Sequence, residues 1–441
     1  MAMTTTKALA EVIDNLKRLH PVVIDLSLGR IEALLDKLGR PQDRLPPVIH
    51  VAGTNGKGST VSYLRSMIQA AGLKAHVYTS PHLVRFNERI VLATTAGKSA
   101  EISDEALIEL LGKVEAANGD APITFFEFIT AAALCAYAEA PADALVLEVG
   151  LGGRLDTTNV VPRPAVTVIT PVSHDHHEFL GETLEAIATE KAGIFRRGVP
   201  AIVGPQEDEA LAAIKRVAAE VGAPLTVWGE DFDAFEQNGR LVFQQHERLV
   251  DLPLPGLVGR HQIINAGVAT AAALALPFEL EEEAIGRGIA AARWPARFMR
   301  LDRGPLVSVA GELSELWLDG GHNPAAGVVL AQSLADLDER SSKPVYLIVG
   351  MMTRKDAVGF LAPFVGLVRG MVAVPIPGHE EGAYDAEALA DIGEAAGLEV
   401  TSEADLVGAV NTIEAADVGP KRILICGSLY LAGHVLAELA G

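Results

Sequence analysis

The sequence contains few residues of the kinds that mark secreted, zinc-scaffold or membrane proteins. Its 441 residues include two cysteines, Cys135 and Cys426, which are too few for a disulfide framework or a cysteine-rich zinc site. Both lie in apolar runs, so we expect buried small side chains. Residues 1–16 lack the apolar core of a signal peptide. The most apolar stretch, residues 263–280, is interrupted by polar residues and proline, which favours a core helix over a membrane span. These absences predict a cytoplasmic protein.

Long runs of basic side chains are also absent. Asp and Glu number 57 against 36 Lys and Arg, which gives a formal net charge of -21. Nucleic-acid binding depends mainly on basic side chains that contact phosphates, so no nucleic-acid partner is expected. A small anionic substrate is still compatible, because a few local basic side chains can bind it. With 49% hydrophobic and 21% charged residues, the chain is expected to fold into two globular domains.

Short β-branched runs alternate with helical patterns along most of the chain. The expected strands are residues 48–51, 75–78, 144–149, 166–170 and 200–203, and the expected helices are residues 59–71, 126–140 and 183–195. This alternation predicts an α/β fold with a mainly parallel sheet that has helices on both faces. Residues 227–251 alternate polar and apolar side chains and predict a small antiparallel excursion, after which helices resume at 260–276 and 281–292.

A second domain is expected to begin near Arg293-Trp294-Pro295, because proline disfavours helical backbone at the residue before it. The predicted domains are therefore residues 1–294 and 295–441. In the second, the alternation repeats on a smaller scale, with strands at 316–319, 345–349, 371–374, 399–401 and 422–426 and helices at 323–337, 385–396 and 428–439. This pattern predicts a smaller, Rossmann-like α/β domain.

The strongest local signal is a glycine-rich turn between a strand and a helix, His50-Val-Ala-Gly-Thr-Asn-Gly-Lys-Gly-Ser-Thr60. Small residues let backbone N–H groups approach phosphate oxygens, and a helix N-terminus favours an anion. The strict P-loop pattern is not met, because Val51 occupies the first glycine position and Gly58 separates Lys57 from Ser59. The turn alone is compatible with a phosphate loop or with an ordinary strand-to-helix turn.

Two further polar clusters follow predicted strands. Glu148 ends one strand and precedes glycines 150, 152 and 153, whose spacing does not match the dinucleotide fingerprint of an oxidoreductase. The cluster Ser173-His-Asp-His-His177 follows the next strand. Because ligands of open α/β sheets bind at the carboxyl ends of the strands, a carboxylate and imidazoles are expected to face one crevice. Oxygen ligands and phosphates suit Mg²⁺, the histidines alone suit zinc, and a solvated polar loop is also compatible.

Taken together, six motifs resemble the folylpolyglutamate synthase and dihydrofolate synthase family of the Mur ligase superfamily. They are Gly53-Thr-Asn-Gly-Lys-Gly-Ser59, Thr79-Ser-Pro-His-Leu-Val-Arg-Phe-Asn-Glu-Arg89, Thr124-Phe-Phe-Glu127, Glu148-Val-Gly-Leu-Gly-Gly-Arg-Leu-Asp156, Glu190-Lys-Ala-Gly-Ile-Phe195 and His322-Asn-Pro324. The resemblance implies a Mur-ligase-type P-loop ATPase domain and a C-terminal glutamate-ligase domain. It also implies ATP-dependent ligation of L-glutamate to dihydropteroate, to a reduced folate, or to both, through an acyl phosphate.

The resemblance also implies the roles of individual residues. ATP would be bound by Gly53, Thr54, Asn55, Gly56, Lys57, Gly58, Ser59, Arg297 and Asp319. The pterin substrate would be bound by Val23, Ile24, Asp25, Leu26, His82, Thr124, Leu155, Asp156, Thr157 and Thr158. One Mg²⁺ would be held by Ser80 and Glu148, and a second by Glu148, His176 and Lys191. In this family the lysine is carbamylated, which turns an ammonium into an oxygen ligand. Lys57, Lys191, Asp319 and His322 would be catalytic.

The chain departs from the family pattern at three places. His174 and Gly321 replace the usual residues beside two of the motifs, and Thr353-Arg-Lys-Asp356 replaces a shorter charged motif of the second domain. The rival interpretations are another Mur-type ligase acting on a UDP-sugar peptide and a non-catalytic nucleotide-binding regulator. The segment Ser80–Arg89 favours the folate branch, and the set Glu148, His176 and Lys191 favours an enzyme over a regulator. Expected partners are ATP, L-glutamate and the pterin substrate alone, with no membrane, and the chain is expected to be a monomer.

Overall fold

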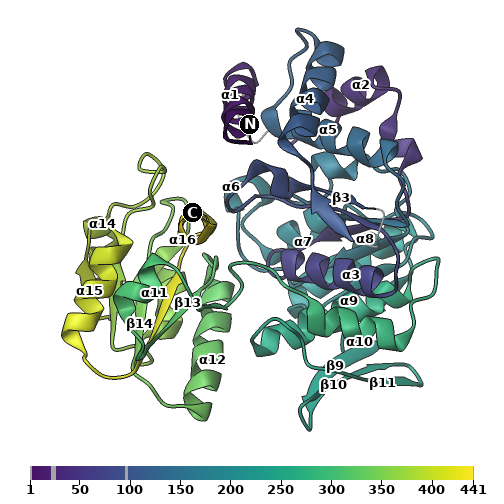
Figure 1. The fold of residues 1–441 in the computed structure, drawn as a ribbon. Helices are drawn as coiled ribbons and strands as arrows, with labels where there is room; N and C mark the ends of the chain where they lie inside the picture. Colours follow the sequence, from purple (N-terminus) through teal and green to yellow (C-terminus); the bar gives the residue numbers. More distant parts are fainter. Residues whose placement is uncertain (1, 21–25, 95–97, 441) are drawn as a thin grey trace. The chain divides into compact units, whose positions relative to one another are not determined.

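The computed structural model describes residues 2–20, 26–94 and 98–440, and it divides the chain into two compact units (Figure 1). Unit 1 contains Met1–Gly256 and Ile263–Ala292, and unit 2 contains Leu257–Gln262 and Arg293–Gly441. The chain changes unit at Ala292–Arg293, beside the proline-containing segment. The short segment Leu257–Gln262 also belongs to unit 2, which the sequence pattern did not indicate.

Unit 1 is built on an eight-stranded sheet with the order β4-β3-β2-β5-β1-β6-β7-β8. Parallel pairing joins the neighbours in the series β2-β5-β1-β6-β7-β8. Strands β3 and β4 add an antiparallel edge next to β2. The bounds are β1 Val48–Ala52, β2 Ala75–Tyr78, β3 Ile90–Ala93, β4 Ser99–Glu101, β5 Ala144–Glu148, β6 Val166–Ile169, β7 Ala201–Val203 and β8 Leu225–Val227. The predicted α/β fold with a mainly parallel sheet is confirmed. Every residue of the central strands β5, β1 and β6 is buried, which explains their continuous apolar runs.

Helices surround this sheet in unit 1. Their bounds are α1 Ala2–Leu19, α2 Gly29–Lys37, α3 Lys57–Ala70, α4 Asp104–Asn118, α5 Phe125–Glu139, α6 His177–Leu180, α7 Leu184–Ala192, α8 Asp208–Val221, α9 Arg260–Leu274 and α10 Glu282–Ala291, with short 3-10 helices η1 Pro41–Arg44, η2 Phe86–Arg89 and η3 Thr157–Val160. Helices α3 and α10 approach closely, because a Cβ on Gly288 would lie 2.4 Å from the Cα of Met67. Helix α5 packs in an apolar cluster with Leu145 and Leu147 of β5.

The antiparallel excursion expected in residues 227–251 is confirmed. It is a separate three-stranded sheet of β9 Phe232–Gln237, β10 Arg240–Gln245 and β11 Arg248–Leu252, in the order β11-β10-β9. The inner strand β10 buries Leu241 and Phe243, while charged side chains on its neighbours face solvent. This polar and apolar alternation is typical of an antiparallel sheet with one covered face.

Unit 2 contains a six-stranded sheet with the order β12-β13-β17-β14-β15-β16, parallel except for β12. The bounds are β12 Met299–Leu301, β13 Ser314–Leu318, β14 Val345–Val349, β15 Gly370–Ala373, β16 Val400–Ser402 and β17 Lys421–Cys426. Its helices are α11 Pro305–Ala310, α12 Pro324–Arg340, α13 Ala357–Leu361, η4 Ala362–Phe364, α14 Ala386–Ala395, α15 Leu406–Ala416 and α16 Leu429–Ala440. The five expected strands are all present, and Leu347, Leu424 and Phe360 lie in the apolar core.

Both large sheets end in short strands. The edge strands β4 and β8 of unit 1 and β12 and β16 of unit 2 have three residues each. Longer strands of up to six residues lie inside the sheets. The unpaired backbone groups at each edge are therefore few.

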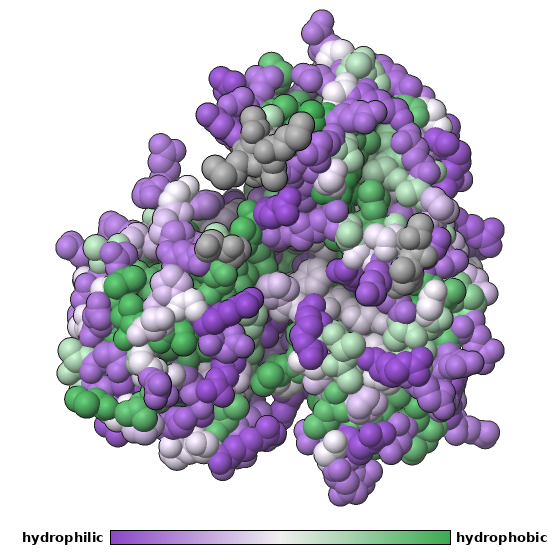
Figure 2. Space-filling model, in the orientation of Figure 1, coloured by the Kyte–Doolittle hydropathy of each residue, from purple (hydrophilic) through white to green (hydrophobic). Residues whose placement is uncertain are grey.

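The surface agrees with the acidic composition. Hydrophilic residues cover much of the visible face of each unit in Figure 2. Cys135 and Cys426 are both buried and unpaired with each other, as expected. Burial raises the pKa of the Cys135 thiol to about 11. Within the described ranges, no helix combines the length and the apolar character that crossing a membrane requires.

Candidate active site

Several of the expected site residues in unit 1 lie at one edge of the eight-stranded sheet. Ser80 follows β2, Glu148 is the last residue of β5, the phosphate loop follows β1, and His176 follows β6. These four strands are neighbours in the order β2-β5-β1-β6 and run in parallel. Their carboxyl ends therefore share the edge at which open α/β sheets bind ligands.

The phosphate loop requires glycine at two positions. Gly53 has φ 145°, and a Cβ there would lie 1.9 Å from Oγ1 of Thr170. Gly56 has φ 89°, and a Cβ there would lie 2.4 Å from Oδ1 of Asn265. Both positions exclude larger residues through backbone conformation and through space. Helix α3 begins directly afterwards, so the N–H groups of its first turn face the loop.

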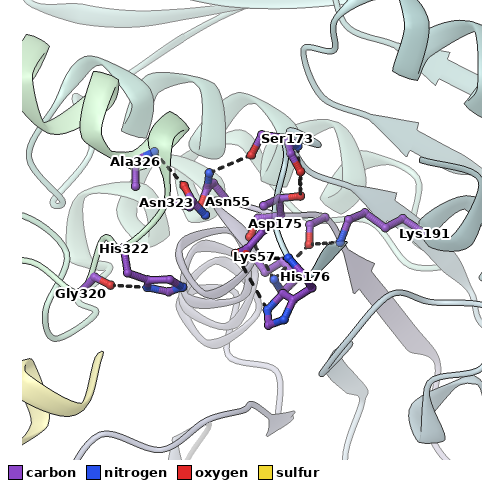
Figure 3. A network of polar contacts seen from close by, with 12 residues as sticks. Asn55, Lys57, Ser173, Asp175, His176, Lys191, Gly320, His322, Asn323 and Ala326 are labelled. Atoms are coloured by element: carbon purple, nitrogen blue, oxygen red, sulfur yellow. Dashed lines mark hydrogen bonds and ion pairs between the residues drawn. The ribbon is translucent and has the colours of Figure 1, made fainter. Parts of the chain in front are cut away.

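The loop is joined to the segment that follows β6. Thr54 and Asn55 donate their backbone N–H groups to the Pro171 carbonyl at 3.0 and 3.3 Å. The Thr54 hydroxyl donates to the Ser173 carbonyl at 3.0 Å, and the Asn55 amide donates to the Ser173 hydroxyl at 3.3 Å (Figure 3). These bonds anchor the segment that carries His176 beside the phosphate loop.

Two lysine side chains converge on one backbone oxygen. Nζ of Lys57 donates to the Gly53 carbonyl at 3.0 Å and to the Thr54 carbonyl at 3.1 Å. Nζ of Lys191, from α7, donates to the same Gly53 carbonyl at 2.9 Å (Figure 3). The two nitrogens therefore lie within about 6 Å of each other, where two positive charges repel. Such a concentration of positive charge suits an anion with several charges.

The environment of Lys191 disfavours its protonated form. The side chain is buried, and this burial is the main reason that its pKa is lowered to about 7. The charge of Lys57 acts in the same direction, while Asp175 and Asp156 oppose it. The lowered pKa favours the neutral amine of Lys191, which is the reactive form of lysine.

The residues expected to hold two metal ions are Ser80, Glu148, His176 and Lys191. Across residues 2–20, 26–94 and 98–440, no three His, Cys, Asp or Glu side chains are grouped as metal ligands. The expected set contains only two residues of these types, Glu148 and His176. Glu148 is buried at its strand end. The Ser80 hydroxyl and the Glu148 carboxylate are oxygen donors of the kind that Mg²⁺ prefers.

The expected pterin residues of unit 1 lie around the start of α5 and the 3-10 helix η3. Thr124 is the N-cap of α5, in a capping box with Glu127. A Cβ on Gly150 would lie 2.5 Å from the Phe126 ring and 3.2 Å from Oδ2 of Asp156, so these three residues are neighbours.

Asp156 is the N-cap of η3, which contains Thr157 and Thr158. Burial raises the pKa of Asp156, while its bonds to Thr158 and to backbone N–H groups oppose the shift. Leu155 and Leu26 are both half-buried. Val23, Ile24 and Asp25 lie outside the described residues.

The side chain of His82 is held by Arg89. Nε of Arg89 donates to Nδ1 of His82 at 2.9 Å, and the Arg89 guanidinium lies over the Phe86 ring. Burial, together with the smaller effect of the Arg89 charge, lowers the pKa of His82 to about 4. His82 is therefore a neutral imidazole with its proton on Nε2.

The expected residues of unit 2 also lie together. Asp319 follows β13 and accepts backbone N–H groups of Phe298 and Gly321, each at 2.6 Å. Burial raises the pKa of Asp319, and the charge of Arg297 opposes this. Nδ1 of His322 donates to the Gly320 carbonyl at 2.8 Å, which orients the ring (Figure 3).

Family models match most of the chain. The Mur ligase middle domain matches residues 51–273, and the dihydrofolate synthetase C-terminal domain matches residues 305–438. The dihydrofolate synthase/folylpolyglutamate synthase of Escherichia coli is 37% identical over 429 residues, covering 97% of this chain and 94% of that protein. The chain belongs to the dihydrofolate synthase/folylpolyglutamate synthase family of Mur ligases.

Solved structures of family members agree with this. Escherichia coli FolC in complex with DHPP and ADP is 35% identical, with a TM-score of 0.86 over 98% of this chain and 97% of that one. A bifunctional folylpolyglutamate synthase/dihydrofolate synthase with Mn, AMPPNP and L-glutamate bound is 34% identical, with a TM-score of 0.83 over 98% of both chains. The fold expected from the family resemblance is confirmed.

Two of the three departures from the family motifs, Gly321 and the segment Thr353–Asp356, have local explanations in the structure. A Cβ on Gly321 would lie 2.9 Å from Oδ1 of Asp319, so glycine gives this turn more room. Asp356 is the N-cap of α13, where it accepts the Gly359 N–H at 2.8 Å. Thr353 donates its N–H and hydroxyl groups to the Gly382 carbonyl. The ends of this segment therefore shape the backbone of unit 2.

Two residues beside the phosphate loop, Asp175 and Asn265, were not predicted as site residues from the sequence. Asp175 raises the pKa of Lys191, and it accepts the backbone N–H of His176 at 2.9 Å. Asn265 places its amide oxygen against Gly56. A signal for Asn265 existed, since it is a buried polar residue in an otherwise Ala-rich helix. Asp175 lies inside the histidine cluster, and its proximity to Lys191 has no sequence signal.

Proposed function

We propose that this protein joins L-glutamate to dihydropteroate and also extends reduced folates with further glutamate residues, using ATP. One observation carries the proposal. Lys57 and Lys191 converge on the phosphate loop, at the sheet edge where strand β5 ends with Glu148. A nucleotide-binding protein without catalysis does not need a second, buried lysine at this point. The similarity to a bifunctional relative over 97% of this chain supports both activities.

The reaction begins by activating a carboxylate, whose oxygen is a poor leaving group. A carboxylate oxygen of the pterin substrate attacks the γ-phosphorus of ATP, the bond from that phosphorus to the bridging oxygen breaks, and ADP leaves. Lys57 and the N–H groups at the start of α3 neutralise the charge on the transferring phosphate. The amine of glutamate then attacks the acyl carbon, phosphate leaves, and the amine loses a proton to give the amide.

Divalent cations, once bound, supply positive charge to the phosphate oxygens. Ser80, Glu148, His176 and Lys191 are the residues that would hold two such ions. Lys191 would do so as a carbamate, formed when its neutral amine bonds to the carbon of CO₂ and releases a proton. Three properties support this modification, namely burial, a pKa lowered to about 7, and the nearby positive charge of Lys57. A carbamate replaces the repulsion between the two lysines with attraction.

The decisive measurement is ADP release with two pterin substrates. Dihydropteroate and tetrahydrofolate are each supplied with ATP and Mg²⁺, with and without L-glutamate. We expect ADP release that requires glutamate with both substrates. Release with only one substrate would restrict the protein to one activity. Release with neither substrate, but with a UDP-sugar peptide, would show another Mur-type ligase, and no release under any condition would favour a nucleotide-binding regulator.

Glu148→Gln is expected to lower the rate and to raise the Mg²⁺ concentration needed for half-maximal activity. The change removes a charged oxygen ligand and keeps the side-chain size, so we expect a loss of roughly 100-fold in rate at fixed Mg²⁺. The measurement is a Mg²⁺ titration of ADP release. Glu230→Gln is the control, since Glu230 forms an exposed ion pair with Lys215. An unchanged Mg²⁺ requirement in Glu148→Gln would reduce Glu148 to a strand-end residue.

A further inference from the structure

A buried chain of hydrogen bonds connects β1 to the segment expected to bind the pterin. Nε2 of His50 lies 2.8 Å from the Thr158 hydroxyl, which in turn donates to Oδ1 of Asp156 at 2.5 Å. Because the Thr158 proton is used on Asp156, the His50 nitrogen must be the donor in the first bond. Burial lowers the pKa of His50 to about 3, so its imidazole is neutral and carries its proton on Nε2.

A second buried chain reaches the adjacent residue from other elements. The Thr130 hydroxyl of α5 donates to the Phe126 carbonyl at 2.9 Å. It must therefore accept from both of its other partners, the Tyr78 hydroxyl at 3.0 Å and the Thr157 hydroxyl at 2.8 Å. Strand β2 and helix α5 thus hold Thr157, while β1 holds Thr158.

All five of these side chains, those of His50, Tyr78, Thr130, Thr157 and Thr158, are buried. Apolar residues of similar size would fill the same space, and hydrogen bonds add little net stability over good apolar packing. What a fully satisfied polar network adds is a single arrangement of the groups that it joins. Here the groups that it joins are consecutive residues of η3, with their protons directed inward.

We infer that His50, Tyr78 and Thr130 are positioning residues, which hold the turn of residues 156–160 in the shape that binds the pterin substrate. The inference rests on the proposed function. None of the three needs to touch the substrate. They act through Thr157, Thr158 and Asp156, so their loss would affect pterin binding and leave ATP binding intact.

The test separates the binding of the pterin substrate from the binding of ATP. In His50→Leu the Thr158 hydroxyl loses its donor, and we expect a KM for dihydropteroate or tetrahydrofolate that is raised roughly tenfold. The KM for ATP should stay within about twofold of the wild-type value, because only pterin binding is affected. In His50→Gln an amide N–H can replace the imidazole donor, so the KM for the pterin substrate should return most of the way to the wild-type value. Direct pterin binding, measured by calorimetry without ATP, should follow the same order.

Thr167→Val is the matched control. Thr167 pairs with His50 across the sheet and is equally buried, but its hydroxyl donates to the Pro200 carbonyl rather than to η3. We expect both KM values to be unchanged. If His50→Leu does not fold, the pair Thr130→Val and Thr130→Ser asks the same question, with serine restoring the hydroxyl.

Two results would overturn the inference. One is a wild-type pterin KM and pterin affinity in folded His50→Leu or Thr130→Val protein. The other is a parallel rise of the ATP and pterin KM values, which a general structural defect would produce. A wild-type enzyme that releases no ADP with any pterin would instead reject the proposed function. Calorimetric pterin binding by that inactive protein would still test the positioning role.

Discussion

Lys57→Ala is expected to remove nearly all of the ligase activity while the protein stays folded. The Lys57 ammonium is held by the Gly53 and Thr54 carbonyls at the start of α3, which is the place for a charge that meets the transferring phosphate. Removal of one preorganised positive donor at a phosphoryl transfer site is expected to lower kcat by roughly 10²- to 10³-fold. The measurement is ADP release at saturating ATP, with circular dichroism to check the fold.

The control for Lys57→Ala is Lys215→Ala. Lys215 forms an exposed ion pair with Glu230, so its loss should change neither rate nor stability noticeably. Near-normal turnover of Lys57→Ala at saturating ATP would contradict the phosphate-loop assignment.

Lys191→Ala is expected to lower activity by at least about 100-fold, because a metal ligand and its charge disappear together. A short carboxylic acid added to the assay should restore part of the rate by filling the vacant ligand position. Lys191→Arg keeps a positive charge but cannot form the carbamate, so it should be as inactive as the alanine variant and should not respond to the acid. This comparison separates the carbamate from the charge of the lysine.

The modification itself can be observed directly. Crystals grown at or above neutral pH with divalent metal should show carbamate density on Nζ of Lys191, and ¹³C-labelled bicarbonate should give a carbamate signal in NMR spectra. Lys57→Ala should weaken that signal, because Lys57 both lowers the pKa of Lys191 and would attract the carbamate anion. A bare lysine in well-ordered density, together with a fully active Lys191→Ala enzyme, would refute the proposal.

Much of the fold was predictable because buried strands are short and continuously apolar. Strands β2 and β14 begin and end at the predicted residues, and most others differ by one or two. Helix α3 begins at Lys57 instead of residue 59, because Gly56 adopts a left-handed conformation and starts the helix earlier. The short antiparallel strands β3, β4 and β12 were not predicted from the sequence.

The sequence was less informative about which side chains meet. Strand-end reasoning predicted that Glu148 and the histidine cluster face one crevice, because the carboxyl ends of parallel strands meet at one edge of a sheet. The structure places both at the edge that also carries the phosphate loop. Strand-end reasoning could not place Lys191 on the Gly53 carbonyl, since that contact joins a helix and a loop 138 residues apart. The hydrogen bonds of His50 are similarly remote in sequence, since Thr158 lies 108 residues away.

The three-residue edge strands bear on how the protein behaves when concentrated. A sheet edge is a template on which another chain can add a strand, and its hazard grows with its length. Edges as short as β4, β8, β12 and β16 offer few backbone groups to a second molecule, so self-association by strand addition is disfavoured in both units. The protection depends on those strands staying in place. Detachment of β16 would expose β15, which has four residues, three of them buried, so mild heating or denaturant is the condition under which aggregation should begin.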